Sequence, residues 1–270
     1  MRSDIERVVT FMYEHYSEPV SLADMADVAR LSQFHFSRTF LTATGVSPGR
    51  FLSAIRVHMA KGLLLTTAQT VTDISYMVGY NSLGTFTTRF TRSVGITPVQ
   101  YRRASGAVSG IPCVSRTAKS GPEPSFDWID GCGVMWFPHP AAGSIDGRVS
   151  VPQGTRIPRI YLGVFDGAIA QGPMMVGAVL EDSPAFRLPC VPEGEWHVMA
   201  VGCVVPQPRP LVDTGPVWMV ASHGPVKVID GEALDVRLRM HSPRSIDPPI
   251  LLALPDLEPY ASPRTIRSLA

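Results

Sequence analysis

The fold of the first part of this chain is decided by the stretch Leu22-Ala23-Asp24-Met25-Ala26-Asp27-Val28-Ala29-Arg30-Leu31-Ser32-Gln33-Phe34-His35-Phe36-Ser37-Arg38-Thr39-Phe40. Its apolar residues recur at intervals of three and four, which predicts amphipathic helices. Ser21 and Ser32 stand where two such helices would begin, and serine is a favoured N-cap because its hydroxyl accepts a bond from a free backbone N–H. The stretch therefore predicts a helix, a turn and a second helix.

The same pattern returns about fifty residues later. Residues 25–32 parallel residues 74–81 at an offset of 49. One residue is then inserted, and an offset of 50 relates the pairs Phe36/Phe86, Phe40/Phe90, Gly45/Gly95, Pro48/Pro98 and Phe51/Tyr101. Pro48 can open a long helix with one apolar side between the two copies, because proline is tolerated in a first helical turn. Residues 1–105 are thus predicted to be all-α, with a repeated helix-turn-helix unit.

A repeated helix-turn-helix points to duplex DNA. In such a unit one helix crosses the backbone and the second lies in the major groove with its N-terminal side chains at the base edges. The phenylalanine pairs are expected to point inward, so the residues around them face outward. We expect DNA contacts from Gln33, Phe34, His35, Ser37 and Arg38 in the first unit, and from Gly84, Thr85, Thr87, Thr88 and Arg89 in the second. Two units on one rigid helix could enter successive major grooves, about 34 Å apart.

Residues 4–103 resemble the AraC/XylS family of transcription regulators. The matching motifs are Leu22-Ala23-x-Met25-Ala26-x-x-Ala29-x-Leu31-Ser32, Phe36-Ser37-Arg38-x-Phe40, Thr44-Gly45-x-Ser47-Pro48, Arg56-x-x-x-Ala60-Lys61-x-Leu63-Leu64, Asp73-Ile74-x-x-x-Val78-Gly79-Tyr80-Asn81-Ser82, Phe86-x-x-x-Phe90 and Gly95-Ile96-Thr97-Pro98-x-x-Tyr101-Arg102. The resemblance implies base contacts by Phe34, Ser37 and Arg38 in the first reading helix, and by Leu83, Gly84, Thr87 and Thr88 in the second.

The chain departs from this family at three points. Arg30 stands where the family usually has a small glycine, and Thr88 stands where it often has arginine. Threonine cannot make the bidentate guanine contact that arginine makes. The second unit is therefore expected to read bases weakly and to hold phosphates through Arg89 and Arg92. The DNA-binding domain, which usually comes last in the family, comes first here.

Composition and charge set the wider frame. The chain is 45% hydrophobic and 17% charged, enough apolar residues for a core. It has no apolar run of membrane-spanning length, and its first residues lack a signal-peptide pattern, so we expect a cytoplasmic protein without a membrane contact. Its four cysteines form no C-x-x-C pair, which gives no sign of a zinc site. Residues 1–105 carry a net charge of +4 and residues 106–270 one of −3, which suggests that only the first part meets a polyanion.

The second part of the chain is predicted to be an all-β sandwich. Residues 106–125 are rich in Ser, Gly and Pro and are predicted as a linker, residues 126–256 as the sandwich, and residues 257–270 as a flexible tail. At Val191-Pro192-Glu193-Gly194 a hairpin turn is expected, with positive φ at Gly194. This region is similar to transthyretin-like or carboxypeptidase-regulatory-like sandwiches. The expected strands are 147–151, 160–165, 175–180, 185–188, 196–204, 217–221 and 234–240.

Two classes of function are consistent with the sequence. The sequence contains no nucleophile elbow, P-loop or dinucleotide fingerprint, and Gly131-Cys132-Gly133 is interpreted as a turn, so no enzyme activity, cofactor or metal is expected. The first class is a DNA-binding transcription regulator, an activator type, whose sandwich senses a small-molecule effector, forms a homodimer or contacts RNA polymerase. The alternative is an enzyme or carbohydrate-binding sandwich with a degenerate helix-turn-helix used for protein contacts.

Overall fold

The computed structural model describes residues 2–104, 125–129, 132–136, 142–172, 174–181, 183–204, 217–229 and 231–252. They belong to two compact units. The helical unit holds residues 2–104 and the short segments 169–172 and 244–252. The β unit holds all other described residues, which lie between 125 and 243. The predicted linker, apart from Ser125, and the predicted tail at 257–270 lie outside the described residues. The domain bounds at 105, 126 and 256 stay predictions.

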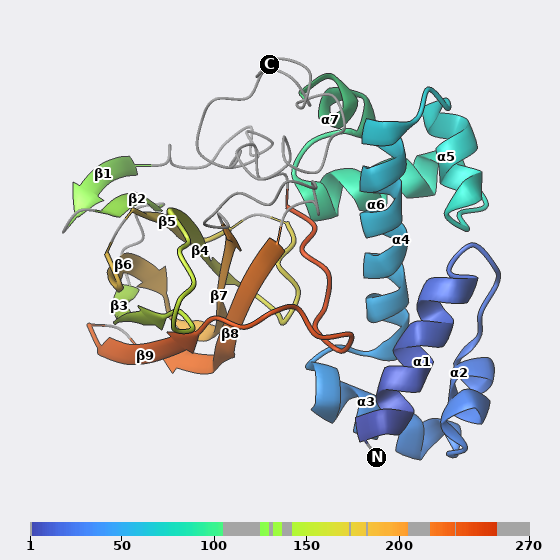
Figure 1. Ribbon diagram of the computed structural model, residues 1–270, viewed down its shortest axis with the longest axis horizontal. Helices are drawn as coiled ribbons and strands as arrows, with labels where there is room; N and C mark the ends of the chain where they lie inside the picture. Colours follow the sequence, from blue (N-terminus) through green and yellow to red (C-terminus); the bar gives the residue numbers. More distant parts are fainter. Residues whose placement is uncertain are drawn as a thin grey trace. The chain divides into compact units, whose positions relative to one another are not determined.

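The helical unit is organised around one long helix, α4. The helices that precede α4 in the chain lie toward one of its ends, and those that follow it lie toward the other (Figure 1). The two-unit arrangement predicted from the repeat is therefore present. In chain order the helices are α1 (Arg2–His15), α2 (Leu22–Ala29), α3 (Gln33–Thr44), α4 (Pro48–Thr66), α5 (Val71–Met77), α6 (Leu83–Val94) and α7 (Pro98–Ala104).

Aromatic side chains fill the centre of each half of the helical unit. Phe40 packs edge-on between Phe36 and Phe51, with ring centroids 5.5 and 5.4 Å apart. In the second half Phe90 contacts Phe86 and Tyr101 at 5.6 and 5.7 Å. Tilted and edge-to-face ring pairs add to the stability gained from burial. The inward phenylalanine pairs expected from the sequence are confirmed, since all four are fully buried.

Helix starts are fixed by side chains in both copies of the repeat. The Ser21 hydroxyl accepts a bond from the Asp24 N–H, and the Asp24 carboxylate accepts one from the Ser21 N–H, which forms a capping box at α2. The Ser21 N–H and the Ser21 hydroxyl, which donates to the same carboxylate at 2.7 Å, lower the pKa of the Asp24 carboxyl. Thr70 and Asp73 form the same box at α5. The two copies thus begin with the same hydrogen-bonded cap.

The two copies end their first helix differently. Arg30 follows α2 in the left-handed region, at φ 57° and ψ 41°, which costs a non-glycine residue about 1–2 kcal/mol. Its counterpart after α5 is Gly79, at φ 82°. A Cβ atom at Gly79 would lie 2.8 Å from the Tyr16 carbonyl oxygen and 3.0 Å from that of Ser17. The second copy therefore needs glycine for space as well as for φ, whereas the first accommodates arginine.

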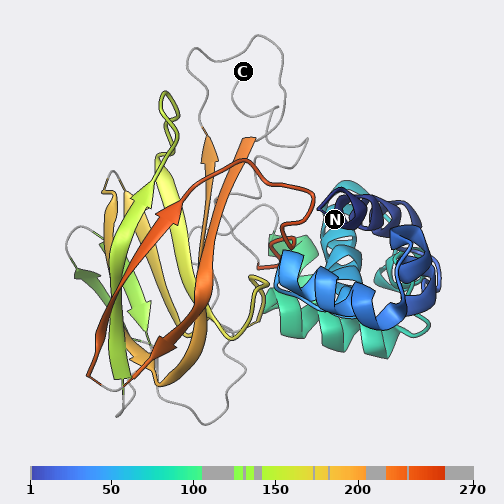
Figure 2. The ribbon, with the colours of Figure 1, turned by 90° about the horizontal axis from the view of Figure 1, so that it is seen from below.

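The β unit consists of two sheets packed face to face, seen as two layers in Figure 2. A six-stranded sheet has the order β1-β2-β5-β4-β7-β8, and a three-stranded sheet has the order β6-β3-β9. Neighbouring strands are antiparallel except β3 and β9, which are parallel. The strands are β1 (Ser125–Ile129), β2 (Cys132–Trp136), β3 (Ala142–Ser150), β4 (Arg159–Phe165), β5 (Val176–Glu181), β6 (Ala185–Pro192), β7 (Gly194–Val204), β8 (Val217–Val228) and β9 (Ala233–Arg239).

The core of the β unit lies between the two sheets. Ile145 and Leu188 of the smaller sheet and Leu162 and Val198 of the larger one are among its most buried side chains. Burial alternates along β3 and β9, because successive side chains of a strand point to opposite faces. The predicted sandwich and its seven strands are confirmed, with β1 and β2 as strands that the sequence analysis did not predict.

Two expectations about the β unit are wrong. Cys132 and Gly133 lie in β2, which pairs with β1 and β5, and not in a turn, while Gly131 lies outside the described residues. The expected hairpin at residues 191–194 is a corner between sheets, since β6 pairs with β3 and β7 pairs with β4 and β8. The positive φ inferred for Gly194 is confirmed at 146°, and the Trp196 indole donates to the Pro192 carbonyl at 2.7 Å across this corner. A local turn signal gives the backbone conformation but not the partner strand.

None of the helices that the structure describes combines the length and apolarity needed to cross a membrane.

Candidate nucleic-acid interface

The first candidate reading helix is α3, and its ends are set by its sequence. The Ser32 hydroxyl accepts a bond from the His35 N–H at 3.4 Å, and Gly45 ends the helix in the left-handed region at φ 72°. Phe36 and Phe40 point into the core. Because a helix has 3.6 residues per turn, this burial leaves the opposite side of α3 outward.

The expected contact residues of α3 share that outward side. Gln33, Phe34, His35 and Arg38 are exposed, and Ser37 is half-buried. Phe34 is 81% exposed, which is unusual for a large aromatic side chain. An apolar side chain presented this way suits a thymine methyl group, and the exposed Arg38 guanidinium suits guanine O6 and N7. The five residues predicted for the first unit therefore lie on one accessible helix side.

The second candidate reading helix, α6, repeats this design with smaller side chains. Ser82 caps it through the Thr85 N–H at 3.2 Å, while Phe86 and Phe90 are buried. The exposed residues of its N-terminal half are Leu83, Gly84, Thr85 and Thr88, and Thr87 is half-buried. Thr88 holds the position that Arg38 holds in α3, so this surface offers hydroxyl groups in place of a guanidinium.

Arg89 faces outward only in part. Its side chain is half-buried, and its Nε donates to the Ser53 hydroxyl of α4 at 3.0 Å. This bond braces α6 against the long helix, and the contact of Arg89 with a phosphate stays a prediction. The repeat relates Arg89 to Thr39 of the first unit, and Thr39 is buried. Comparison of the two copies could therefore have predicted the partial burial of Arg89. Arg92 is exposed and remains a candidate for phosphate contact.

Other arginines of the helical unit also serve its structure. Arg56 of α4 donates to the carbonyl oxygens of Tyr16 and Glu18, both at 2.7 Å, and burial lowers its pKa. Arg102 donates to the carbonyls of Leu64 and Gln69. These bonds hold chain segments that the sequence analysis could not place together. Part of the positive charge on residues 1–105 is thus carried by guanidinium groups that bind backbone carbonyls of the same unit.

Both candidate reading helices pack against the long helix α4. Helix α4 has 19 residues, so at 1.5 Å per residue it is about 28 Å long. The helices α3 and α6 contact it toward its opposite ends (Figure 1).

Within the described residues, no group of three His, Cys, Asp or Glu side chains could hold a metal ion.

A protein family described as "Helix-turn-helix domain" matches residues 25–104. Over 101 residues the chain is 29% identical to the bifunctional transcriptional activator/DNA repair enzyme AdaA of Bacillus subtilis, covering 37% of this chain and 48% of AdaA. It is 32% identical over 103 residues to the HTH-type transcriptional activator RhaS of an Enterobacter species, covering 38% of this chain and 37% of RhaS. The chain thus spans less than half the length of these two relatives.

Among solved structures, the chain is similar to the DNA-binding domain of the global transcriptional factor AdpA in complex with a target DNA. The identity is 31% and the TM-score is 0.37, over 38% of this chain and 93% of the AdpA domain. The match to the helix-turn-helix family coincides with the repeated units built around α4. Residues 25–104 form a helix-turn-helix DNA-binding domain of the AraC/XylS family.

Proposed function

We propose that this chain is a sequence-specific, DNA-binding transcription regulator of the activator type, whose two helix-turn-helix units enter adjacent major grooves. The observation that carries the proposal is the pair of outward helix sides on α3 and α6, held by one rigid helix of about 28 Å. That length is close to the spacing of about 34 Å between successive major grooves on one face of the duplex. RhaS and AdaA, whose names describe transcriptional activators, support the same function.

The β unit then supplies regulation. Binding of a small-molecule effector, formation of a homodimer and contact with RNA polymerase are the roles proposed for it, in a regulator that works in the cytoplasm where bacterial DNA lies. We propose no enzyme activity for the chain, although AdaA combines activation with DNA repair. The alternative function, a sandwich enzyme or carbohydrate-binding module with a helix-turn-helix used for protein contacts, predicts no salt-sensitive duplex binding.

The test is a footprint of the full chain on duplexes selected from a random library. We expect two protected windows on one face, separated by one helical turn of about 10 base pairs. Affinity should fall steeply with salt, because each neutralised phosphate releases counterions. A single protected window would refute the two-groove arrangement, and the absence of any protected duplex would refute DNA reading altogether.

The two reading helices should contribute unequally to base recognition. Arg38→Ala removes a guanidinium suited to bidentate guanine contact and should cost about 1–3 kcal/mol of binding, with relaxed preference in one half-site. Thr88→Ala, at the equivalent position of α6, should cost much less. Binding of both variants to the selected duplex and to single-base variants of it measures the difference. Equal losses would contradict the assignment of α6 as the weaker reader.

A further inference from the structure

The outer face of the three-stranded sheet carries a concentration of arginine. Burial alternates along β3 and β9. The even-numbered residues of β3 and the odd-numbered residues of β9 therefore point away from the core. The strand register places Arg148 beside Arg237, Ser150 beside Arg239, and Asp146 between Arg187 and Asp235. We call the surface formed by Arg148, Arg187, Arg237 and Arg239 the arginine face.

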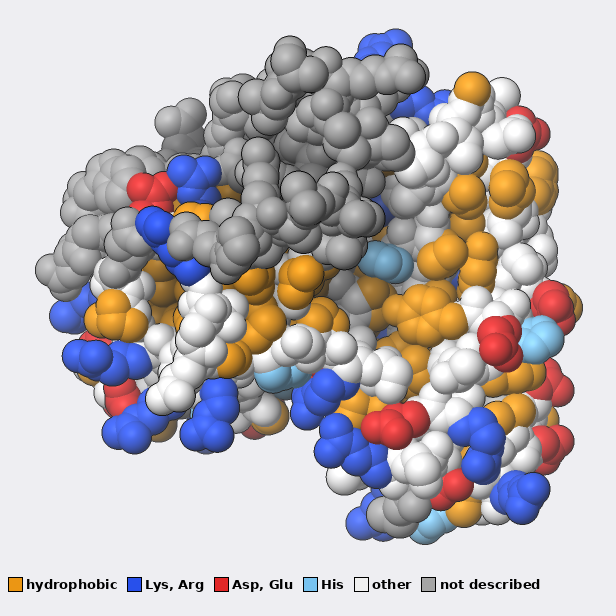
Figure 3. All heavy atoms as spheres, in the orientation of Figure 1, with side chains coloured by type: hydrophobic (Ala, Val, Ile, Leu, Met, Phe, Trp, Pro, Cys, Tyr) orange, Lys and Arg blue, Asp and Glu red, His pale blue; other side chains and the backbone are white. Residues whose placement is uncertain are grey.

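Charge in the β unit is segregated onto this face. The described residues between 142 and 243 contain seven Lys or Arg and seven Asp or Glu. Four of those seven cations belong to the arginine face, against two of the seven acids, Asp146 and Asp235. Figure 3 shows Lys and Arg side chains gathered over β3 and β9. The negative net charge inferred for the second part of the chain is therefore not spread evenly, and this face is locally positive.

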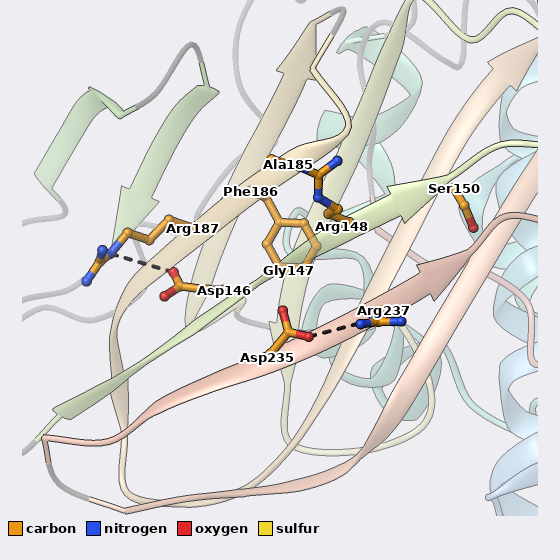
Figure 4. A pocket seen from close by; sticks show the side chains of 9 residues that line it. All are labelled: Asp146, Gly147, Arg148, Ser150, Ala185, Phe186, Arg187, Asp235 and Arg237. Carbon is orange, nitrogen blue, oxygen red and sulfur yellow. Dashed lines mark ion pairs between the residues drawn. The ribbon is translucent and has the colours of Figure 1, made fainter.

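Two of the four arginines are only loosely paired. Arg187 Nε lies 3.6 Å from Asp146 Oδ1, and Arg237 Nε lies 3.8 Å from Asp235 Oδ2. Figure 4 shows both pairs on the lining of a shallow hollow that also includes Arg148. Exposed pairs at such distances contribute about 0–1 kcal/mol and hold neither partner firmly. The two guanidinium groups thus stay available to a stronger anion.

The other two arginines have no described partner. Arg148 and Arg239 form no ion pair or side-chain hydrogen bond with any residue that the structure describes. Arg148 stands directly opposite Arg237, and like charges opposite one another destabilise a sheet. A local arrangement that costs stability without a compensating contact is typical of a functional surface. An anion laid across β3 and β9 would turn this repulsion into attraction.

We propose that the arginine face binds the phosphate backbone of duplex DNA, in addition to the grooves entered by α3 and α6. Guanidinium groups pair with phosphate oxygens through two parallel hydrogen bonds, which favours arginine for this task. The inference rests on the proposed function, because DNA bound by the helical unit would raise the local concentration of phosphates around the rest of the same chain.

The openness of the face favours a polymer over a small anion. The Arg237 and Asp235 side chains are 89% and 71% exposed, whereas a small-molecule site buries most of its ligand. A small anion here would keep most of its hydration and gain little from screened charges. A polyanion gains from several such contacts at once and from the release of its condensed counterions.

The test uses the full chain and a labelled random-sequence duplex of about 40 base pairs, with fluorescence anisotropy at several salt concentrations between about 50 and 200 mM. In R148A/R239A the slope of log Kobs against log salt should become less negative by about 1.8, or about 0.9 for each lost phosphate contact. The loss should be the same on every sequence, because phosphate contacts carry no base information. R148Q/R239Q, which retains polar side chains on the face, should give the same change in slope. It replaces the alanine variant if that variant is poorly folded.

Two further variants separate this effect from a structural one. D146N/D235N should bind the duplex more tightly and with a steeper slope, because it releases Arg187 and Arg237 and removes two repelling charges. K227A removes an exposed cation from β8 in the other sheet and should leave the slope unchanged.

Failure of the wild-type chain to bind any duplex would overturn the proposed function. Wild-type binding combined with an unchanged slope in R148A/R239A would overturn the arginine face alone. The arginine face would likewise be ruled out if K227A changed the slope per charge as much as R148A/R239A does.

Discussion

Replacing Phe90 by alanine is expected to unfold the second helix-turn-helix unit and to abolish specific DNA binding. The Phe90 side chain is fully buried and contacts the rings of Phe86 and Tyr101. Removing a buried phenylalanine side chain costs about 3–5 kcal/mol, because burial is lost and a cavity remains. That loss is a large fraction of the total stability of a typical domain, which is about 5–15 kcal/mol. Thermal melting followed by far-ultraviolet circular dichroism, to which helices contribute most, measures it.

The matched control for this change is Phe34→Ala. Phe34 is the same residue type but 81% exposed on α3, so its removal should leave the melting temperature nearly unchanged. It should still weaken binding at the first half-site, where the ring is proposed to contact a base. The assignment of core and surface would be wrong if Phe34→Ala destabilised the protein as much as Phe90→Ala.

Gly147→Ala is expected to disrupt the β unit. Gly147 lies in β3 with its missing side chain directed into the sandwich, and an added Cβ would collide with the Val236 carbonyl oxygen of β9. It would also lie 2.7 Å from Cζ of the Phe186 ring. Overpacking of a core costs about 1–3 kcal/mol, and more when the obstacle is backbone. Since β3 is the central strand of its sheet, the strand cannot move away without breaking its pairs with both neighbours.

Tryptophan fluorescence reports on this part of the chain, because the four tryptophans are Trp128, Trp136, Trp196 and Trp218. The fluorescence transition of Gly147→Ala should shift to lower temperature by several degrees. Gly62→Ala is the control, since a Cβ atom at this position of α4 has no neighbour within 4 Å, and alanine favours a helix. A normal fluorescence transition in Gly147→Ala would show that the approach of β3 to Val236 is looser than described.

The sequence was sufficient for features that depend on local periodicity. The repeat, the phenylalanine pairs, the serine caps and the alternating strands all follow from spacing within a few residues. The candidate DNA contacts of α3 were predicted for the same reason, because burial of Phe36 and Phe40 determines which side of one helix faces outward. The hydrogen bond between Arg89 and Ser53 could not be predicted, because the two residues are 36 positions apart and lie in different helices.

Features that depend on pairing between distant strands could not be predicted. The corner after β6 has the same local sequence whether the next strand joins the same sheet or the opposite one. The arginine face depends on the register that places Arg148 beside Arg237, about ninety residues later in the chain. The net charge could not reveal the arginine face, because a sum over residues contains no information about which side of a sheet each residue occupies.

The parallel pairing of β3 with β9 has a consequence for how the protein is synthesised. β3 is the middle strand of its sheet, yet one of its two neighbours, β9, is synthesised about ninety residues later. At about 5–20 residues per second, β3 waits about 5–20 s for β9, with an unpaired edge exposed throughout. The helices, whose contacts are formed among residues 2–104, are complete well before this interval begins. We therefore expect the nascent chain to present its DNA-reading helices while the β unit is still open to aggregation and to chaperones.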